Sequence, residues 1–415
     1  MVTYKEGILK LNSQTDILDI VWNVCFFMRL LSIVCFGNVP SLYYASFFIL
    51  LGVSLAEAIV KGKFSTKIFV PLHTIWYGLF IVLGVVSSIW ADVFSRSFGP
   101  ISKMIQILVV SYCLIIHIDS YEKLESYITS SIIASFVLVV YIFALTPSSM
   151  WFSGFLGSVT SYNTNDIGCA VSIAVIFSYY KAFIKHKKYM YALCAIFFFV
   201  AILTSSRKAL FMSVLGIVMI TMFNFRAKNY VLRLMVVFAL MALVILMIYE
   251  IPALYNTVGV RLDSIIEYIM EDKSADSSMA IRQYFIDMAK MFYYENPVFG
   301  IGLNNFAYRL SLYDGMVSYA HNNYCEIAAD LGTIGLIMYY WFYLYIAIKL
   351  VAQIINGHKT ALVFSAMMLL FLIFEYGMVN YYKEQVHIVI TAAFIAICLN
   401  DKAHNEKSNL TELQL

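Results

Sequence analysis

Three segments of the sequence place polar and charged residues where long apolar runs begin or end. The first is LTSSRKAL at residues 203–210, which puts Arg207 and Lys208 between two such runs. The fork of an arginine pairs bidentately with phosphate oxygens, so this pair could bind an anion. The alternative is a pair of cations whose alkyl stems lie along the membrane while their charged ends reach water.

The second segment, SSMAIRQYFIDMAKMFYYENPVFGIGLNNF, covers residues 277–306. Its apolar spacing predicts a helix that begins near Ser277, lies along the membrane surface and ends at Asn-Pro. Arg282 stands in its first turn, where the helix dipole disfavours a cation, so an anion is expected nearby. That anion could be a substrate or a carboxylate of the same segment, such as Asp276 or Asp287. GIGLNNF follows a helix instead of a strand, which argues against a phosphate-binding loop.

The third segment, AHNNYCEIAADLGTIG at residues 320–335, leads directly into an apolar run. It places His321, Asn322 and Asn323 at the membrane face and Glu326 one turn deeper. Ionisable groups at membrane depth are costly and usually face a cavity or a partner. A lone interfacial histidine is usually structural, so the case for His321 rests on its neighbours.

Two weaker patterns were considered. Asn165 opens another apolar run and could touch a sugar, although helix capping is the alternative. Asp263, Glu267 and Glu271 are spaced four apart, and we interpret them as a solvated helix face because no paired-carboxylate motif accompanies them. We therefore expect no metal site and no cofactor.

The composition explains what must position these residues. The chain has 62% hydrophobic and 13% charged residues and a net charge of +3, and its mean hydropathy is +0.80. Soluble domains have about 25% charged residues, so this is a membrane protein. No Lys/Arg run suited to nucleic acid occurs, and the cysteine spacing indicates neither disulfides nor zinc.

Apolar runs of about 20 residues each predict an all-α integral membrane protein with about twelve spans. The predicted spans lie near residues 17–37, 39–60, 68–90, 104–118, 126–146, 166–181, 189–205, 208–224, 232–250, 324–348, 360–379 and 386–400.

Lys and Arg gather in alternate loops, which predicts that both termini are cytoplasmic. The one large loop, residues 251–323, is then extracytoplasmic and is expected to contain short helices. The predicted organisation is a bundle of about nine spans (1–250), this large loop (251–323), further spans of the same bundle (324–400) and a cytoplasmic tail (401–415).

The three segments together resemble the O-antigen ligase and polymerase family, which includes Wzy-type repeat-unit polymerases. The resemblance is concentrated between about Thr204 and Leu336 and rests on TSSRKAL, on AIRQYF through ENPVFGIGLNNF, and on AHNNYCEIAADLGTIGL. It implies a metal-independent glycosyltransferase of GT-C type in the bacterial cytoplasmic (inner) membrane, with an extracytoplasmic active site. By position it implies that Arg207, Arg282 and His321 are catalytic.

The resemblance also implies substrates. The donor would be a glycan on undecaprenyl pyrophosphate, and the acceptor a sugar hydroxyl of a lipid-linked repeat unit. Lys208, Asn165, Asn322, Asn323 and Glu326 are the predicted substrate-binding residues. Other polysaccharide-assembly proteins, such as a flippase and a chain-length regulator, are expected partners.

Within the family, SSRKA and AHNNY with a following YY look most like capsule and exopolysaccharide polymerases. A ligase that transfers the glycan to lipid A-core is the first alternative. A transporter or flippase is the second, although the repeats and Gly/Pro-broken helices typical of transporters are absent from the sequence pattern.

Overall fold

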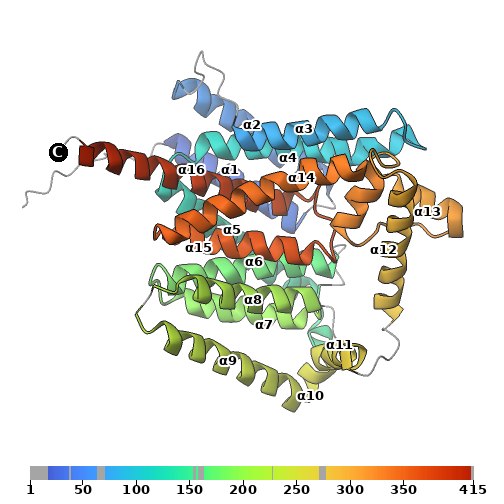
Figure 1. The fold of residues 1–415 in the computed structure, drawn as a ribbon. Coiled ribbons are helices and arrows are strands. Elements are labelled where there is room, and N and C mark those ends of the chain that lie inside the picture. Colours follow the sequence, from blue (N-terminus) through green and yellow to red (C-terminus); the bar gives the residue numbers. More distant parts are fainter. Residues whose placement is uncertain are drawn as a thin grey trace, which may run out of the picture.

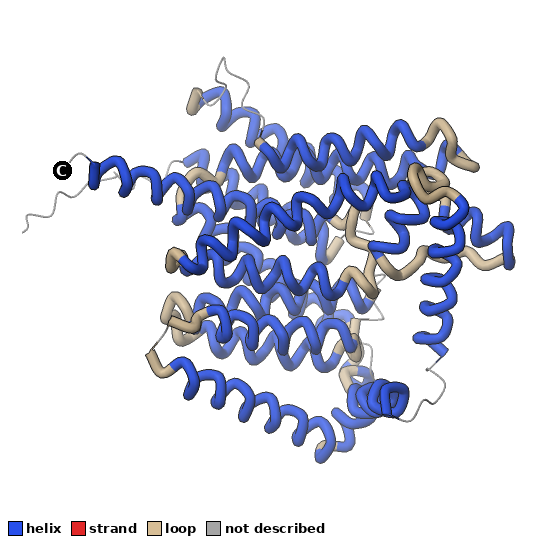
Figure 2. Tube along the Cα trace, viewed as in Figure 1, coloured by secondary structure: helices blue, strands red, loops and turns tan. Residues whose placement is uncertain are grey.

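The computed structural model describes residues 17–36, 39–62, 71–152, 156–157, 163–226, 228–270 and 277–412. Within these ranges the chain is helical and contains no strand (Figure 2). The predicted all-α fold is therefore confirmed for the described part of the chain.

Nine helices of the described chain precede residue 251, and each overlaps one of the predicted spans. They are α1 (Ile17–Val34), α2 (Pro40–Val60), α3 (Leu72–Ser87), α4 (Phe98–His117), α5 (Tyr121–Leu145), α6 (Thr164–Phe183), α7 (Met190–Leu203), α8 (Arg207–Phe223) and α9 (Tyr230–Glu250). Two short 3₁₀ turns, η1 (Phe94–Ser97) and η2 (Ser148–Met150), accompany them.

The large loop contains short helices, as expected from the sequence. They are α10 (Pro252–Leu254), the π-helical turn η3 (Tyr255–Gly259), α11 (Val260–Met270), α12 (Ser277–Glu295) and α13 (Phe306–Asp314). Three further helices of the described chain follow: α14 (Asn323–Ile355), α15 (Lys359–Phe374) and α16 (Glu384–Glu412). The last helix continues beyond residue 400, where the sequence pattern placed the end of the final span.

Eight helices of the described chain are long and apolar enough to cross a membrane by length and composition. They are α1, α2, η1 with α4, α5, α6, α9, α14 and the first part of α16. The apolar helices α3, α7 and α15 are shorter. An all-helical integral membrane protein is thus supported, while twelve spans remain a prediction.

Small residues let α6 lie at the centre of the bundle. A Cβ atom on Gly168 would come within 2.7 Å of Ala209 Cβ, and one on Gly216 within 2.5 Å of the Ile176 side chain. Such close approach of helices is typical of membrane bundles. Nearly all of α6 is buried, whereas α9 exposes most of its apolar side chains, as a helix that faces lipid would.

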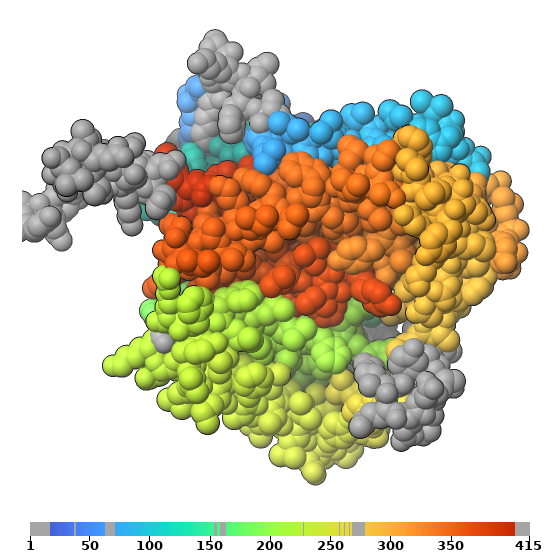
Figure 3. Space-filling view, viewed as in Figure 1, coloured from blue at the N-terminus to red at the C-terminus, as the bar shows by residue number. Residues whose placement is uncertain are grey.

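The large loop covers one end of the bundle. In Figure 1 the long helices run roughly parallel, and α12 runs across their right-hand end. Figure 3 shows the loop residues in gold over the same end. This arrangement brings α12 close to the first residues of α14 and to the start of α8.

A break in α14 anchors the loop. At Gly332 the backbone has φ 65° and ψ −164°, a conformation that only glycine adopts readily. A Cβ there would lie 2.3 Å from the Val298 carbonyl oxygen. The Asp330 carboxylate accepts hydrogen bonds from the backbone N–H groups of Asn304 (2.6 Å) and Phe306 (3.0 Å). The backbone of GIGLNNF therefore packs against the break in α14, where its N–H groups bind Asp330. This structural role agrees with the interpretation that the segment is not a phosphate-binding loop.

Candidate active site

A tight turn fixes the start of α8. Ser205 has φ 53°, and the Ser206 hydroxyl caps the helix by accepting from the N–H of Ala209 at 3.4 Å. The same hydroxyl donates to Asn165 Oδ1 at 3.0 Å. Asn165 therefore supports the helix cap in front of Arg207, and its contact with a sugar remains a prediction.

Arg207 links the bundle to the large loop. Its Nη1 atom lies 3.3 Å from the Ser264 hydroxyl on α11 and 3.6 Å from the Met279 sulfur on α12. Both partners are neutral, so these contacts orient the guanidinium without neutralising its charge.

Lys208 links the same end of α8 to the segment between α15 and α16. Its ammonium group donates a hydrogen bond to the carbonyl oxygen of Gly377. It also interacts electrostatically with Arg282, Asp166 and Arg207. Lys208 is therefore within electrostatic range of charged side chains on α6, α8 and α12.

Arg282 stands on α12 with no carboxylate beside it in the described part of the chain. Asp287, one of the two partners considered from the sequence, accepts instead from Gln283 at 3.0 Å and from Lys290 at 3.1 Å. The other, Asp276, lies outside the described residues. No ion pair of Arg282 occurs among the described residues, although burial of a cation favours pairing.

His321 faces Arg282 and Lys208 from the segment before α14. Its ring lies 3.9 Å from the Tyr319 ring and stacks at 5.8 Å on Phe285 of α12, and its Nε2 atom is 3.4 Å from the Ser318 hydroxyl. Burial, together with the charges of Arg282 and Lys208, lowers the pKa of His321 to about 4. The ring is therefore neutral at pH 7 and able to accept a proton or a hydrogen bond.

The structure thus brings Arg282, Lys208 and His321 into electrostatic range of one another, and Lys208 extends the cluster to Arg207. Arg207 and Lys208 come from α8, and Arg282 and His321 come from the large loop. We define them as the cation cluster. Such a group of fixed donors suits the binding of a polyanion.

Asn322, Asn323 and Glu326 hold the chain around His321. The Asn322 side chain caps α14 by accepting from the N–H of Cys325 at 3.0 Å. Glu326 accepts from the N–H of Ala320 at 2.5 Å. These contacts give both residues local structural roles and leave their predicted substrate contacts untested.

Asn323 joins α14 to the segment 375–383. Its Oδ1 atom accepts from the N–H groups of Asn380 (2.8 Å) and Tyr381 (3.2 Å), and its Nδ2 atom donates to Glu375 at 3.2 Å. The Glu375 carboxylate also accepts from Tyr340 (2.7 Å) and Tyr343 (2.9 Å). Glu375 was not predicted from the sequence, although a carboxylate at the end of an apolar run is a local signal for such a residue.

An ion pair missed by the sequence analysis lies beside the cation cluster. Lys383 Nζ is 3.0 Å from Asp166 on α6, and both side chains are partly exposed. Lys103 of α4 interacts electrostatically with both residues. Lys383 follows Tyr381 and Tyr382, and a lysine in a polar segment carries no local signal of such a pairing.

Arg309 of α13 joins the large loop to the bundle. Its guanidinium makes a bidentate pair with Asp92, at 2.8 and 2.9 Å, and a longer contact to Glu295 at 3.4 Å. Arg309 therefore ties α13 to the segment that follows α3. A bidentate pair between segments 217 residues apart cannot be read from local sequence.

The acidic face predicted for the loop falls partly on described residues. Asp263 accepts hydrogen bonds from Tyr249 (2.7 Å) and Tyr255 (2.8 Å), Glu267 is exposed, and Glu271 lies outside the described residues. A different group, Asp19, Glu57 and His117, places possible metal-ligand atoms within 4.8 Å of one another. Lys61 already pairs with both of its carboxylates, at 2.7 and 3.2 Å.

Comparison with known proteins identifies the segment that carries these residues. No curated protein matches the chain. Residues 192–340 match the model of a family described as O-antigen ligase. The matched segment contains Arg207, Lys208, Arg282 and His321, together with the whole large loop. The chain therefore carries an O-antigen ligase family domain over residues 192–340, which confirms the resemblance drawn from its three polar segments.

Proposed function

We propose that this chain is a glycosyltransferase that polymerises polysaccharide repeat units outside the cytoplasmic membrane. The donor is a glycan on undecaprenyl pyrophosphate, and the acceptor is a sugar hydroxyl of a lipid-linked repeat unit. The carrying observation is Arg282, a cation without a carboxylate partner in the described chain, which lies in electrostatic range of Lys208 and His321. A diphosphate supplies the anion that this position lacks.

The reaction breaks the bond between the anomeric carbon and the diphosphate oxygen. The acceptor oxygen forms a new bond to that carbon and loses its proton to His321 or, if the ring binds the diphosphate, to solvent, while the electron pair of the broken bond stays on the diphosphate. Preorganised cations stabilise the charge that develops on this leaving group. Arg207 and Arg282 take this role, and Lys208 contributes its charge from the Gly377 side.

His321 is placed for one of two roles. As a neutral ring it can donate one N–H to the diphosphate, or it can accept the proton of the acceptor hydroxyl. We favour diphosphate binding, because a transition state with oxocarbenium character demands little of a base. In either role, the negative charge of a bound donor offsets Arg282 and Lys208, so the pKa of His321 rises when the donor binds.

The proposal includes the architecture needed for this site. Twelve spans in a GT-C-like bundle put both termini, Lys61, Lys187 and Lys359 in the cytoplasm, and put Asp276 and Tyr313 outside. Residues 1–250 and 324–400 form one bundle, 251–323 the catalytic loop and 401–415 a tail. A flippase and a chain-length regulator are proposed partners.

The alternative functions predict different products. A ligase would use the same leaving group but would transfer a finished chain to lipid A-core, and a flippase would form no glycosidic bond. The decisive experiment is the fate of the glycan in a deletion strain. Single repeats on a surface lipid support the polymerase, and long chains retained on undecaprenol identify a ligase. Normal synthesis of the lipid-linked repeat unit, with the repeat unit retained on the cytoplasmic face of the membrane, identifies a transporter.

A further inference from the structure

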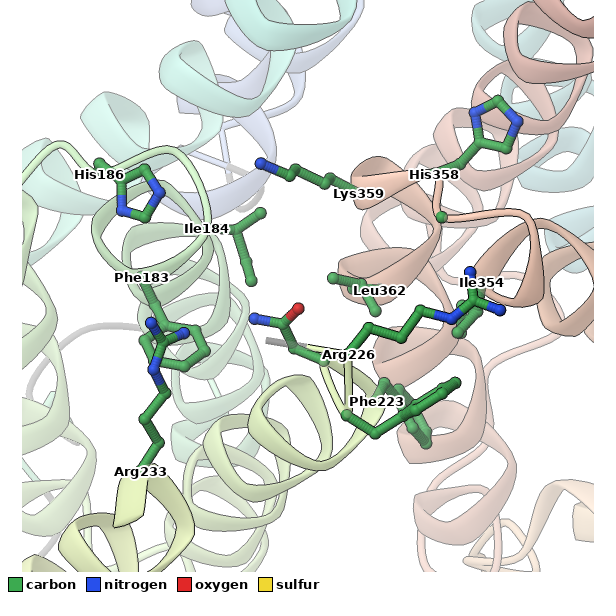
Figure 4. Close-up of a pocket in the computed structure, with 13 residues that line it drawn as sticks. Phe183, Ile184, His186, Phe223, Arg226, Arg233, Ile354, His358, Lys359 and Leu362 are labelled. Atoms are coloured by element: carbon green, nitrogen blue, oxygen red, sulfur yellow. The ribbon is translucent and has the colours of Figure 1, made fainter. Parts of the chain in front are cut away.

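A second candidate binding site lies at the end of the bundle opposite α12. The α6–α7, α8–α9 and α14–α15 turns meet there (Figure 1) and enclose a cavity of about 300 Å³. Figure 4 shows Arg226, Arg233 and Lys359 around the cavity, each from a different segment, with Ile184 and Leu362 between them.

The lining of this cavity is strongly cationic. Its polar residues are Arg226, Arg233, Lys359, His186, His358 and Asn224, and no carboxylate belongs to the described residues that line it. Arg233 stacks over the Phe183 ring at 5.1 Å. Neither Arg226, Arg233 nor Lys359 forms an ion pair with a described residue.

Several other cations at this end of the bundle have carboxylate partners. Lys181 and Lys185 pair with Glu125 at 3.3 and 2.8 Å, and Lys349 pairs with Asp401 at 3.0 Å. Lys187 and Lys188 are exposed at the same end but do not line the cavity, whereas Arg226, Arg233 and Lys359 surround one space. Three uncompensated cations around one cavity favour an anionic ligand.

The rest of the lining is apolar. Ile184 and Leu362 are buried, and Phe183, Phe223 and Ile354 are partly buried. The exposed apolar surface of α9 continues from Arg233. A free phosphate would use only the cationic residues, whereas a phospholipid would contact both the cations and the apolar surface.

We propose that this cavity binds the phosphate group of an anionic phospholipid from the leaflet around this end of the bundle. Arg226, Arg233 and Lys359 contact the phosphate. The first methylene groups of the lipid's acyl chains pack toward Phe183 and α9. The site is independent of the cation cluster at the other end of the molecule.

The test uses the full-length purified protein and native mass spectrometry. Phosphatidylglycerol and zwitterionic phosphatidylcholine are titrated separately, and inorganic phosphate is added as a competitor. The variant is Arg226→Gln/Arg233→Gln. The matched control is Lys187→Gln/Lys188→Gln, which removes the same charge from exposed positions at the same end that do not line the cavity.

We expect phosphatidylglycerol to bind more tightly than phosphatidylcholine and to lose roughly 30-fold in affinity in the arginine variant, the effect of two basic contacts near a lipid surface. The control should change less than about threefold. Lys359→Gln, tested alone, should bind phosphatidylglycerol with about fivefold lower affinity. This single variant provides the test if the double variant does not fold.

Three results would overturn the proposal. Equal losses in the arginine variant and the lysine control would mean that only general surface charge attracts the lipid. Equal affinity for both lipids would exclude a phosphate-specific site for anionic lipid. Displacement of the lipid by millimolar inorganic phosphate would identify a site for free phosphate instead.

Discussion

Replacing Arg282 is the sharpest test of the proposed active site. The side chain has no carboxylate partner in the described chain, so Arg282→Ala should leave no buried acid unpaired and should cost little stability. Its charge should be used in the transition state, where one lost stabilising donor costs about 3 to 4 kcal/mol, or roughly 100- to 1000-fold in kcat. Arg282→Lys should also be strongly impaired, because a point charge cannot reproduce the bidentate contact of a guanidinium.

The control for Arg282 is on the same helix. Lys290 is half exposed and pairs with Asp287 at 3.1 Å. Exposed pairs of this kind contribute about 0.2 to 1 kcal/mol. Lys290→Ala should therefore retain activity within about twofold. Turnover is measured with purified protein and a lipid-linked repeat unit, and chain length is measured in a complemented deletion strain with protein levels checked by blot.

The variant has a second readout that a structural role would not change. Because the charge of Arg282 helps to lower the pKa of His321 to about 4, its removal should raise that pKa toward the ordinary value of 6.5. The pKa of His321, measured by NMR titration of the protein without donor, should then be higher in Arg282→Ala and unchanged in Lys290→Ala. Full-length polymer from a well-expressed Arg282→Ala protein would refute the proposed site, whatever the measured pKa.

Four further predictions follow from the same contacts. His321→Ala should raise the donor KM with a near-normal kcat if the ring binds diphosphate, and a lowered kcat at saturating donor would indicate base catalysis. The folded-state pKa of His321 lies below 6.5, so its contribution to stability is present above pH 6.5 and declines as the pH falls toward 4. Acid-unfolding curves of the wild type and of His321→Gln, compared over this range, measure the difference. Activity should survive excess EDTA, and loss that Mg²⁺ restores would reveal a missed metal site. Asn323→Ala leaves buried partners unsatisfied and should destabilise the protein by about 1 to 3 kcal/mol, whereas the exposed Asn356→Ala should not alter thermal unfolding.

The helices could be predicted because their signal is local. Each predicted span overlaps a helix, since an apolar run of sufficient length must satisfy its backbone within itself in a membrane. The cap of α8 and the end of α12 also follow from neighbouring residues. Helix ends were less accurate: α16 continues past residue 400 because its polar tail has helical propensity that hydropathy alone does not detect.

The contacts around the site could be predicted only in part. TSSRKAL and AHNN indicated where charged and polar residues enter the bundle, and the structure places Lys208 and His321 near Arg282. Glu375, Lys383 and the bidentate partner of Arg309 were missed, because each depends on a residue far away in the sequence. The break at Gly332 was also missed, since a glycine inside an apolar run fits a continuous helix equally well.

Cations with carboxylate partners differ in role from cations without such partners in the described chain. Arg29 in α1 forms a buried pair with Glu384 at 2.5 Å, and Lys61, Lys181 and Arg309 also have carboxylate partners. A cation that leaves water without such a partner loses solvation that nothing in the chain restores. Arg282 is partly buried without such a partner at one end of the described bundle. At the other end Arg233 is partly buried without one, and the exposed Arg226 and Lys359 line the same cavity. A bound anion would restore the missing interaction, and this reasoning supports both proposals, a diphosphate at the first site and a lipid phosphate at the second.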